Sequence, residues 1–547
     1  MMLLDLDTVA GPIDPTDRRY ARLLAQLQGN ILKSHGRNYT VNLFLTFAPG
    51  VQGAVEDWIG TFSRRYVTSA LRQMHESAEF KANGLSGRIF AGLSLSAKGY
   101  EYLGKDLTAF VEKRNPSLTS NVLFSRGIKD EQTQQDLKDS DAKDWDINGS
   151  GKEVHALVLL ADEDPNRLKD VLGRVVDDLA QRKVLSDCVQ VDGIGLRDEN
   201  NQPLEHFGYR DGISQPLFFV EDVEAERSHF GTSEWDPSAA LSLVLVPDPF
   251  APTPESFGSY FVFRKLEQDV LGFKRQEAKL AELLEDFTKK NGLPIFKEER
   301  AGALVVGRFE NGVPTETAGS EQAEQFRDFN DFDYRDDVRI TQDQAGQVTE
   351  IAAMRCPFQG HIRKTNPRGD TRRVTLPALN VPIPEDVDQV EKGRRITRRG
   401  ITYGERALNP NGSLIPPELQ KDGTLKPPVK GQVGLLFQCY QASIPDQFGF
   451  MQASWANNPN FPAPATGLDP IIGQGNLAAV PQQWPPVYDA SDNKQPFSFG
   501  GFVKMRGGEF FFTPSIPFLL SFGDDNDYVK ADSAENERRL LPNKTAE

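Results

Sequence analysis

The stretch between residues 154 and 196 constrains the fold more than any other part of the sequence. It starts with VHALVLLAD, an apolar run with the length and composition of a buried strand. Asp164-Pro165 then opens a helix, whose apolar residues recur at helical spacing at Leu168, Val171, Leu172, Val175, Val176 and Leu179. CVQVDGIGL (188–196) follows as a second strand. Packing the helix onto a sheet buries both apolar surfaces, so the sequence predicts mixed helix and sheet layers.

The rest of the chain carries further elements of both kinds. In the first half we expect a helix from residues 16–17 to Gly36, with an apolar stripe at Tyr20, Leu23, Leu24, Leu27 and Ile31. TVNLFLTF (40–47) predicts a strand with one face formed by Val41, Leu43, Leu45 and Phe47, and a long helical segment follows with Trp58, Phe62 and Leu71. In the second half the patterns predict strands at 258–266, 431–441 and 508–514, and helices at 269–290 and 444–457.

The similar order of elements in the two halves predicts two α+β domains. We place the first at residues 1–222 and the second at 257–523, separated by a polar, proline-rich linker at 223–256. A segment rich in Pro, Gly, Asn and Lys at about 405–430 is expected to be an inserted surface loop. The polar residues 524–547 are expected to form a tail.

Charge and apolar patterning exclude several classes of partner. The formal net charge of −16 opposes binding to nucleic acids and anionic membranes. No apolar run reaches the length of about 18 residues that a membrane span needs. The start, MMLLDLDTVAGP, has no basic region and carries two aspartates, so we expect no signal peptide and a cytoplasmic location. Cys188, Cys356 and Cys439 form no CxxC pair or paired framework, which suits either a reducing compartment or simply buried thiols.

Two stretches carry unusual combinations of functional side chains. The six histidines show no zinc spacing, and HExxH, P-loop, nucleophile-elbow and dinucleotide-binding motifs are missing from the sequence. What stands out is EHFGYRDGISQP (205–216) and MRCPFQGHIRKTNPRGD (354–370). Taken singly, Asp211-Gly212 is an ordinary turn and His361 a loop residue. Together with RRITRRGITYG (394–404), they supply the acid, histidine and arginine of a haem peroxidase site.

At these residues the chain resembles the dye-decolourising peroxidases, the DyP-type haem peroxidases. The family hallmark GxxDG is present as residues 208–212, and the family's proximal-histidine segment resembles CPFQGHIRKTNPR (356–368). LQGNIL (27–32), GSYFVFRKLEQDV (258–270) and GLLFQCYQ (434–441) also look like family segments, so the resemblance spans about residues 23–517. It implies two ferredoxin-like domains of the dimeric α+β barrel type, with antiparallel sheets, helices, and haem held mainly by the second domain.

The resemblance implies haem b, one per chain, with His361 as the axial ligand and the metal ligand of the site. A ligating imidazole needs an acceptor for its other nitrogen, and we expect Asp469 in GLDPIIG (467–473) to provide it, with Asp446 and Glu509 as alternatives. Asp211 is expected to move the proton of hydrogen peroxide, a task that a distal histidine performs in other peroxidases. An unperturbed aspartate titrates at about 3.9, so we expect activity to be best at acid pH unless burial raises that value.

Further side chains are expected to hold the cofactor and its oxidant. Arg398 aligns with the family's distal arginine, which stabilises negative charge on peroxide and on the ferryl oxygen. Arg368 resembles the family's propionate-binding arginine, and Arg363 is a second candidate. Cofactor contacts are also expected from Gly212, Ile213, Ser214, Gln215, Leu435 and Phe437, although the last two could simply be strand core.

Large dyes cannot enter a pocket sized for peroxide. Family members are thought to oxidise them at surface Tyr or Trp residues, with electron transfer through the protein. Trp455 and Tyr403 lie near the site segments and are candidates, although each could equally be a packed core aromatic.

The chain departs from the family pattern between His361 and Arg398. The spacing is long for the family, with the charged residues 384–395 in between, and the loop at 405–430 adds more. Which arginine is distal therefore stays open among Arg394, Arg395, Arg398 and Arg399.

The sequence leaves three hypotheses for the function of this chain. The first is a peroxidase that uses hydrogen peroxide to oxidise bulky aromatic compounds and dyes, as a monomer or homo-oligomer. The second is a haem-handling protein with little turnover, which would not need Asp211 and Arg398 together. The third is a haem-free interaction protein, which would leave the GxxDG segment and the basic loop unexplained.

Overall fold

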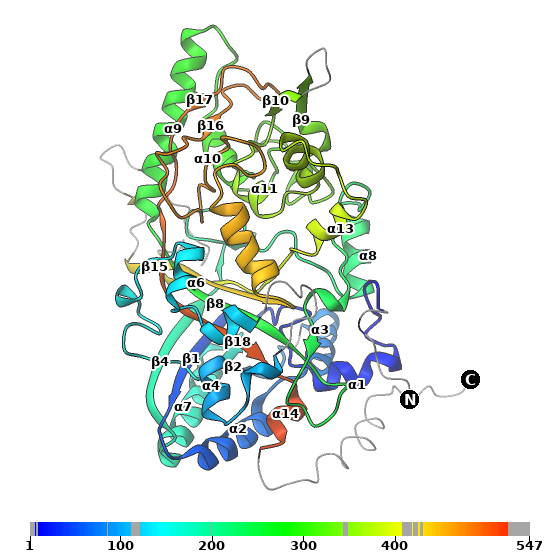
Figure 1. Cartoon of the computed structure of the whole chain (residues 1–547), viewed down its shortest axis with the longest axis vertical. Helices are drawn as coiled ribbons and strands as arrows, with labels where there is room; N and C mark the ends of the chain where they lie inside the picture. Colours follow the sequence, from blue (N-terminus) through cyan, green and yellow to red (C-terminus); the bar gives the residue numbers. More distant parts are fainter. Residues whose placement is uncertain are drawn as a thin grey trace, which may run out of the picture.

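The structure is a computed structural model that describes residues 6, 9–84, 86–110, 121–198, 200–342, 348–406, 418–419, 425–426 and 430–522. Figure 1 shows an elongated arrangement in which a twisted sheet and the N-terminal helices occupy the lower part. Segments from the middle and the end of the chain form the upper part. Most of the expected loop at 405–430 and the expected tail at 524–547 lie outside the described residues.

The centre of the fold is a ten-stranded sheet whose hydrogen-bonded neighbours run antiparallel. The order along its main path is β11-β15-β8-β18-β2-β3-β1-β4, with β12 paired to β15 and β7 to β8. From the first half come β1 (Tyr39–Phe47), β2 (Phe90–Ser96), β3 (Ala156–Asp162) and β4 (Leu185–Ile194). From the second half come β7 (Val246–Pro247), β8 (Phe257–Gln268), β11 (Thr397–Arg398), β12 (Ile401–Glu405), β15 (Lys430–Gln441) and β18 (Val503–Thr513).

The first half has the β-α-β-β-α-β order of a ferredoxin-like unit. Helices α2 (Gln52–Tyr66) and α3 (Ala70–Asn83) connect β1 to β2, and α7 (Pro165–Arg182) connects β3 to β4. The α7 helix starts where the sequence predicts, because the Asp164 side chain accepts the Asn166 N–H. Its buried face is formed by Leu168, Val171, Val175 and Leu179, whereas Val176 is exposed. Shorter helices between β2 and β3 are α4 (Ala97–Tyr102), α5 (Asn121–Arg126) and α6 (Glu131–Leu137).

The upper part of Figure 1 contains the second-half helices α9 (Val270–Lys290), α10 (Glu299–Val306), α11 (His361–Thr365) and α13 (Val387–Lys392), whereas α14 (Ile516–Leu520) lies in the lower part beside α2. Helix α9 follows β8 and is capped by Asp269, which accepts the Gly272 N–H. The second half also forms two small hairpins, β9 (Val338–Gln342) with β10 (Val348–Ala353) and β16 (Gln483–Trp484) with β17 (Gln495–Pro496). Helices α1 (Arg18–Gln26) and α8 (Val220–His229) complete the larger elements.

The two halves meet at both edges of their sheets. On one side β18 pairs with β2, with Phe511 opposite Ser96. On the other side the Thr402 hydroxyl of β12 accepts the Leu196 N–H at 3.1 Å and donates to the Ile194 carbonyl of β4. Aromatic side chains from both halves fill the space between, including Phe44, Phe263 and Phe511. This is the barrel-like α+β arrangement that the sequence analysis expects.

Replacing Phe44 by alanine tests this shared core. The Phe44 side chain is 1% exposed, and its ring centroid lies 4.8 Å from that of Phe263 on β8. Because the cavity would open between the two halves, we expect Phe44→Ala to lower the free energy of unfolding by about 3–5 kcal/mol. Urea unfolding measures this, with Phe80→Ala as the control, since Phe80 is 57% exposed on α3. Equal losses in both variants would contradict the shared core.

Several predicted elements are wrong in extent. The first helix ends at Gln26 rather than near Gly36, because the backbone turns extended at Leu27. The long helical segment after β1 is two helices, α2 and α3. Strand β2 was not predicted, although Ala91, Leu93 and Leu95 alternate with small or polar residues in FAGLSLS. The helix expected at 444–457 is a pair of π-helical turns, Pro445–Gly449 and Met451–Ala456.

None of the helices in the described ranges combines the length and the apolar character that crossing a bilayer requires. The domain boundaries at 222/223 and 256/257 stay predictions, since one sheet runs through both halves.

Candidate functional site

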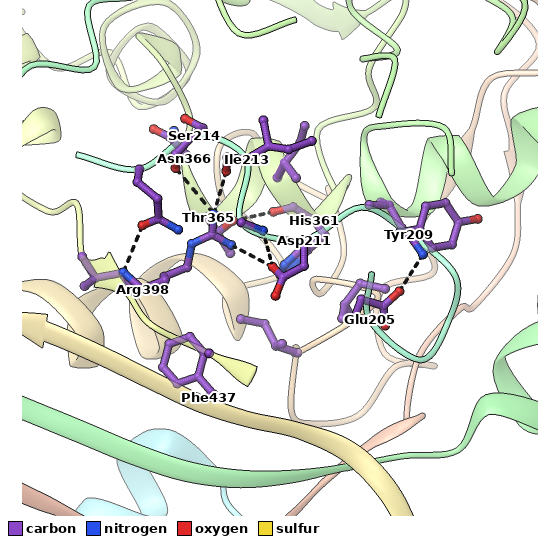
Figure 2. A pocket seen from close by; sticks show the side chains of 18 of the residues that line it. Glu205, Tyr209, Asp211, Ile213, Ser214, His361, Thr365, Asn366, Arg398 and Phe437 are labelled. Atoms are coloured by element: carbon purple, nitrogen blue, oxygen red, sulfur yellow. Dashed lines mark hydrogen bonds and ion pairs between the residues drawn. The ribbon is translucent and has the colours of Figure 1, made fainter. Parts of the chain in front are cut away.

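A cavity of about 460 Å³ lies where the hairpin at residues 205–216 meets α11 and the ends of β8, β11 and β15. Its volume falls within the range of small-molecule and cofactor sites. The structure brings together in its wall most of the residues that the sequence analysis selects: Asp211, Gly212, Ile213, Ser214, Gln215, His361, Arg368, Arg398, Leu435 and Phe437. Figure 2 shows Asp211, His361 and Arg398 converging on this cavity from separate segments.

His361 is the first residue of α11, and a buried carboxylate orients its ring. The Nδ1 atom lies 2.9 Å and 3.2 Å from the two carboxylate oxygens of Asp469. Asp469 is fully buried and also accepts the N–H groups of Ile471 and Ile472 at 2.8 Å and 2.9 Å. Burial opposes ionisation of Asp469, but the interaction with His361 and these backbone donors lower its pKa. The pairing leaves Nε2 as the ring nitrogen available to a ligand.

The two alternative partners of His361 are engaged elsewhere. Asp446 forms an ion pair with Arg394 at 2.9 Å. Glu509 accepts the Ile128 N–H at 2.9 Å and the Asn148 side-chain amide at 2.6 Å. The geometry therefore selects Asp469.

Asp211 and Arg398 are neighbours at the cavity wall. The Arg398 Nη1 atom lies 3.9 Å from Asp211 Oδ1, and its Nη2 donates to the Ile213 carbonyl at 2.8 Å. The Arg398 N–H donates to the Gln215 side chain at 3.1 Å. Asp211 Oδ1 in turn accepts the Gly212 N–H at 2.7 Å. The segment that carries Asp211 thus also holds the Arg398 side chain of β11 in place. The two groups are close enough to act on one small molecule.

The backbone of the hairpin bends in ways that require glycine. Gly208 has φ 105° and Gly212 has φ 81°, a region that other residues rarely adopt. A side chain at Gly212 would meet nothing within 4 Å, so space does not exclude one there. The Glu205 carboxylate accepts the N–H groups of Phe207 and Tyr209 at 2.8 Å and 2.9 Å and so ties the turn together.

Glu205 predicts a pH dependence of stability. Burial raises the pKa of this carboxyl from 4.5 to about 7, against hydrogen bonds from Phe207, Tyr209 and Gln268 that favour ionisation. The folded chain therefore holds the proton more tightly than the unfolded chain does. The contribution of Glu205 is most favourable below about pH 4.5 and falls by about 3 kcal/mol as the pH rises to about 7. We expect Glu205→Gln to remove this decline, as measured by unfolding at several pH values; an unchanged decline would contradict the assignment.

The four arginines of residues 394–399 have different surroundings. Arg394 pairs with Asp446, and Arg395 donates to the carbonyls of Lys392, Pro237 and Ser238. Arg399 donates to the carbonyls of Asn30, Ile31 and Arg398. Within the described residues only Arg398 of this group forms an ion pair with Asp211. The structure thus favours Arg398 among the arginines that the sequence analysis leaves open.

Arg368 and Arg363 lie in different environments. Arg368 lines the cavity and donates to the Ser214 hydroxyl at 3.0 Å and to the carbonyls of Asn330 and Phe332. Arg363 is fully buried, does not line the cavity, and pairs with Asp337 and Asp370. Residues two apart on a helix point to nearly opposite sides, so Arg363 faces away from the cavity that His361 faces. Arg363 therefore lies outside the cavity wall, and its role as a cofactor contact stays a prediction that this geometry does not favour.

The two aromatic candidates for surface electron transfer are core residues. Trp455 and Tyr403 are each 5% exposed, and neither lines the cavity. Trp455 stacks on Phe461 with ring centroids 5.3 Å apart, and the pKa of Tyr403 is raised by burial. Their places in a π-helical turn and a sheet strand bury them, so the packed alternative holds for both.

Four aromatic residues of the cavity wall were not selected from the sequence: Phe207, Tyr209, Trp235 and Tyr334. Trp235 lies in the expected linker, yet it lines the cavity and packs against the Arg368 guanidinium at 4.6 Å. Tyr209 occupies a variable position of the GxxDG motif and also lines the cavity. Only its place between Gly208 and Asp211 could have drawn attention to it.

Comparisons with known proteins agree with this geometry. No family model matches the chain. The multifunctional dye peroxidase DyP2 of Amycolatopsis sp. is 38% identical over 510 residues, covering 92% of this chain and 96% of that protein. The dye-decolorizing peroxidase msp1 of Mycetinis scorodonius is 28% identical over 90% of this chain and 86% of its own length. The crystal structure of a DyP-type peroxidase from Anabaena sp. matches with a TM-score of 0.76 and 37% identity, covering 94% of this chain and 97% of that one.

Proposed function

This chain belongs to the dye-decolourising peroxidase family and is a peroxidase, and from that premise we propose that its cavity binds one haem b through His361. The observation that carries the proposal is the joint arrangement of three groups. Asp469 orients the His361 ring, and Asp211 lies 3.9 Å from Arg398 in the same cavity. An axial ligand, a proton-transfer group and a charge-stabilising group are what peroxide reduction at haem iron requires.

The cavity wall suits a flat, mostly apolar ring that carries anionic groups at its edge. Apolar side chains from six segments contribute to the wall: Ile213, Leu266, Ile362, Leu435, Phe437, Met451 and Ile472. Arg368, buried at the same wall, supplies a cation for a propionate. In the described part of the chain no three His, Cys, Asp or Glu side chains form a group that could hold a metal ion. A single imidazole therefore suits an iron whose other ligands come from the ring itself.

The residues of this chain would divide the work as follows. Haem, when bound, supplies the iron at which peroxide is reduced and the oxidising equivalents that pass to the reductant. Asp211 would take the proton from one peroxide oxygen and return it to the departing one. Arg398, fixed by the Ile213 carbonyl and the Gln215 side chain, would stabilise the negative charge that develops during this step. Asp469 would keep the His361 ring oriented and electron-rich.

A haem-handling protein is the second candidate, since a carrier also needs an axial histidine and apolar walls. The pair formed by Asp211 and Arg398 argues against a haem-handling role. Two side chains of opposite charge at an apolar wall cost desolvation energy, and a carrier gains nothing from them. Peroxide reduction uses both.

A visible spectrum followed by rapid mixing with hydrogen peroxide tests the proposal. We expect the haem-loaded protein to show a Soret band that peroxide changes within the mixing experiment. Arg398→Leu should keep the band but react about 10²–10³-fold more slowly, because the charge on peroxide loses its main stabilising group. A missing Soret band would contradict haem binding. A band that peroxide leaves unchanged, with no effect of Arg398→Leu, would favour the carrier.

A further inference from the structure

A buried polar cluster lies against the cavity wall and has no part in the chemistry proposed so far. The Tyr209 hydroxyl donates to Glu277 Oε1 at 2.5 Å. Lys274, one turn earlier on α9, lies 2.8 Å from Glu277 and 2.7 Å from Glu310. Tyr209 is 3% exposed, whereas the Glu310 side chain is 40% exposed. The cluster therefore runs from a ring in the cavity wall to the protein surface.

The surrounding structure is shaped to hold the phenol against the carboxylate. A Cβ atom at Gly302 of α10 would lie 1.7 Å from the Tyr209 hydroxyl oxygen and 1.8 Å from Glu277 Oε1, so only glycine leaves room for the pair. The Tyr209 ring meets Phe273 edge-on and carries the Lys274 ammonium at 5.2 Å. Figure 2 shows the Tyr209 hydroxyl turned away from Asp211. The phenol thus faces its own acceptor rather than the distal acid.

Stability alone is a poor reason for such a cluster. Taking carboxylates and an ammonium out of water costs several kcal/mol for each ion, and apolar residues of similar volume often do as well. Phe207, on the same hairpin, already fills its part of this wall by stacking on Phe273 at 4.0 Å. Phenylalanine at position 209 would extend that packing without a hydroxyl that needs a buried acceptor.

The chemistry of phenols supplies a reason. A tyrosine that loses one electron becomes strongly acidic, so it is oxidised readily only when a base takes the proton at the same time. Burial, with the negative charge of Glu277, raises the pKa of Tyr209, so the resting phenol keeps its proton. The Glu277 carboxylate is hydrogen-bonded to that proton and can receive it directly.

We propose that Tyr209 is a redox-active tyrosine that carries oxidising equivalents out of the cavity, with Glu277 as the acceptor of its phenolic proton. The proposal rests on the proposed peroxidase function, which supplies the oxidant. A cavity of about 460 Å³ that holds a cofactor has no room for a bulky dye, so electrons from such a reductant must cross the wall. Tyr209 is part of that wall.

The step balances as a one-electron transfer. One electron leaves the Tyr209 ring for the oxidised centre that peroxide produces in the cavity, and the O–H bond breaks as its proton passes to Glu277. The products are a neutral tyrosyl radical and a neutral carboxylic acid. An aromatic reductant at the surface then gives one electron, and the proton returns from Glu277 to the phenolate oxygen. Lys274 stays charged throughout, because Glu277 and Glu310 raise its pKa despite burial.

Tyr334 provides a matched control within the same cavity. It also lines the wall and is 1% exposed. Among the described residues, however, no carboxylate accepts a hydrogen bond from its hydroxyl, and its ring packs on the Arg363 guanidinium at 4.3 Å. Both rings therefore carry a cation, and what Tyr334 lacks is the base that would take its phenolic proton.

Electron paramagnetic resonance of the haem-loaded protein, frozen shortly after one equivalent of hydrogen peroxide, tests the proposal. We expect a neutral tyrosyl radical in the parent and in Tyr334→Phe, and its loss in Tyr209→Phe. Glu277→Gln should also lose most of the signal, since an amide can accept the hydrogen bond but not the proton. In Tyr209→Phe, turnover of a dye too large for the cavity should also fall.

The outcomes separate the two proposals. A parent that reacts with peroxide, together with a Tyr209→Phe variant that keeps the radical and the dye turnover, would overturn the role of Tyr209 alone. An undiminished radical in Glu277→Gln would overturn the role of Glu277. A parent with no Soret band or no reaction with peroxide would overturn the proposed function, and the tyrosine relay with it.

Discussion

Asp211→Asn is expected to slow the first reaction with hydrogen peroxide by about 10²–10⁴-fold, the contribution of a well-placed proton-transfer group. Asparagine has nearly the same shape, so the hairpin should keep its geometry. It can still accept the Gly212 N–H that Asp211 accepts at 2.7 Å. What it cannot do is take a proton from one peroxide oxygen and return it to the other. Stopped-flow spectroscopy at increasing peroxide concentrations measures the effect as a second-order rate constant.

Asp236→Asn is the matched control for this loss. Asp236 is exposed, follows the cavity-lining Trp235 and does not itself line the cavity. The Asp236→Asn variant should react with peroxide at the parent rate. An Asp211→Asn variant that reacts as fast as the parent would remove the central role of Asp211, and Arg398 would then have to act with another proton carrier.

The second large effect is expected from His361→Ala, which should lose most of its haem. The ring is the protein group placed to bind iron, because Asp469 holds Nδ1 at 2.9 Å and leaves Nε2 available. Without the imidazole, only the contacts of the cavity wall would hold the macrocycle, and we expect them to retain little of it. The measurement is the Soret absorbance per mole of protein after reconstitution and removal of free haem.

Two comparisons make the result specific. His229→Ala should keep full loading, since His229 is exposed on α8 and does not line the cavity. His361→Gly should regain a histidine-like spectrum when imidazole is added, because the vacated space is the size of the missing ring. A fully loaded and active His361→Ala variant would refute the axial assignment.

The chemistry of the site could be predicted largely from local sequence. Asp211, His361 and Arg398 each sit in a short motif with unusual neighbours, and all three line one cavity. Asp469 was chosen over Asp446 and Glu509 by resemblance alone, and the contact at 2.9 Å with His361 across 108 positions of the chain is a tertiary fact. The local sequence could not show that Arg363 is buried between Asp337 and Asp370 and outside the cavity wall, since those contacts are tertiary.

The helices and strands also differ in how well the local sequence predicts them. Strands and helices with strong apolar periodicity, such as β1 and α7, could be predicted because burial on one face imposes the period. Strand β2 was not predicted: FAGLSLS alternates apolar with small or polar residues, but the run is short, and only the structure shows that it pairs with β3 and β18. Its place is decided by neighbours from distant parts of the chain.

The sequence by itself determined the family, the fold class and the three residues proposed to meet the iron and the peroxide. These features can be identified from short sequence motifs, because each motif fixes the local backbone conformation and the functional side chains within a few residues. Only the tertiary structure decided which acid orients His361, which arginine stands beside Asp211, and that Tyr209 shares its proton with Glu277. Each of those pairings joins side chains from separate segments. The direction in which these side chains point is set by how helices and strands pack, and no local sequence pattern encodes that packing.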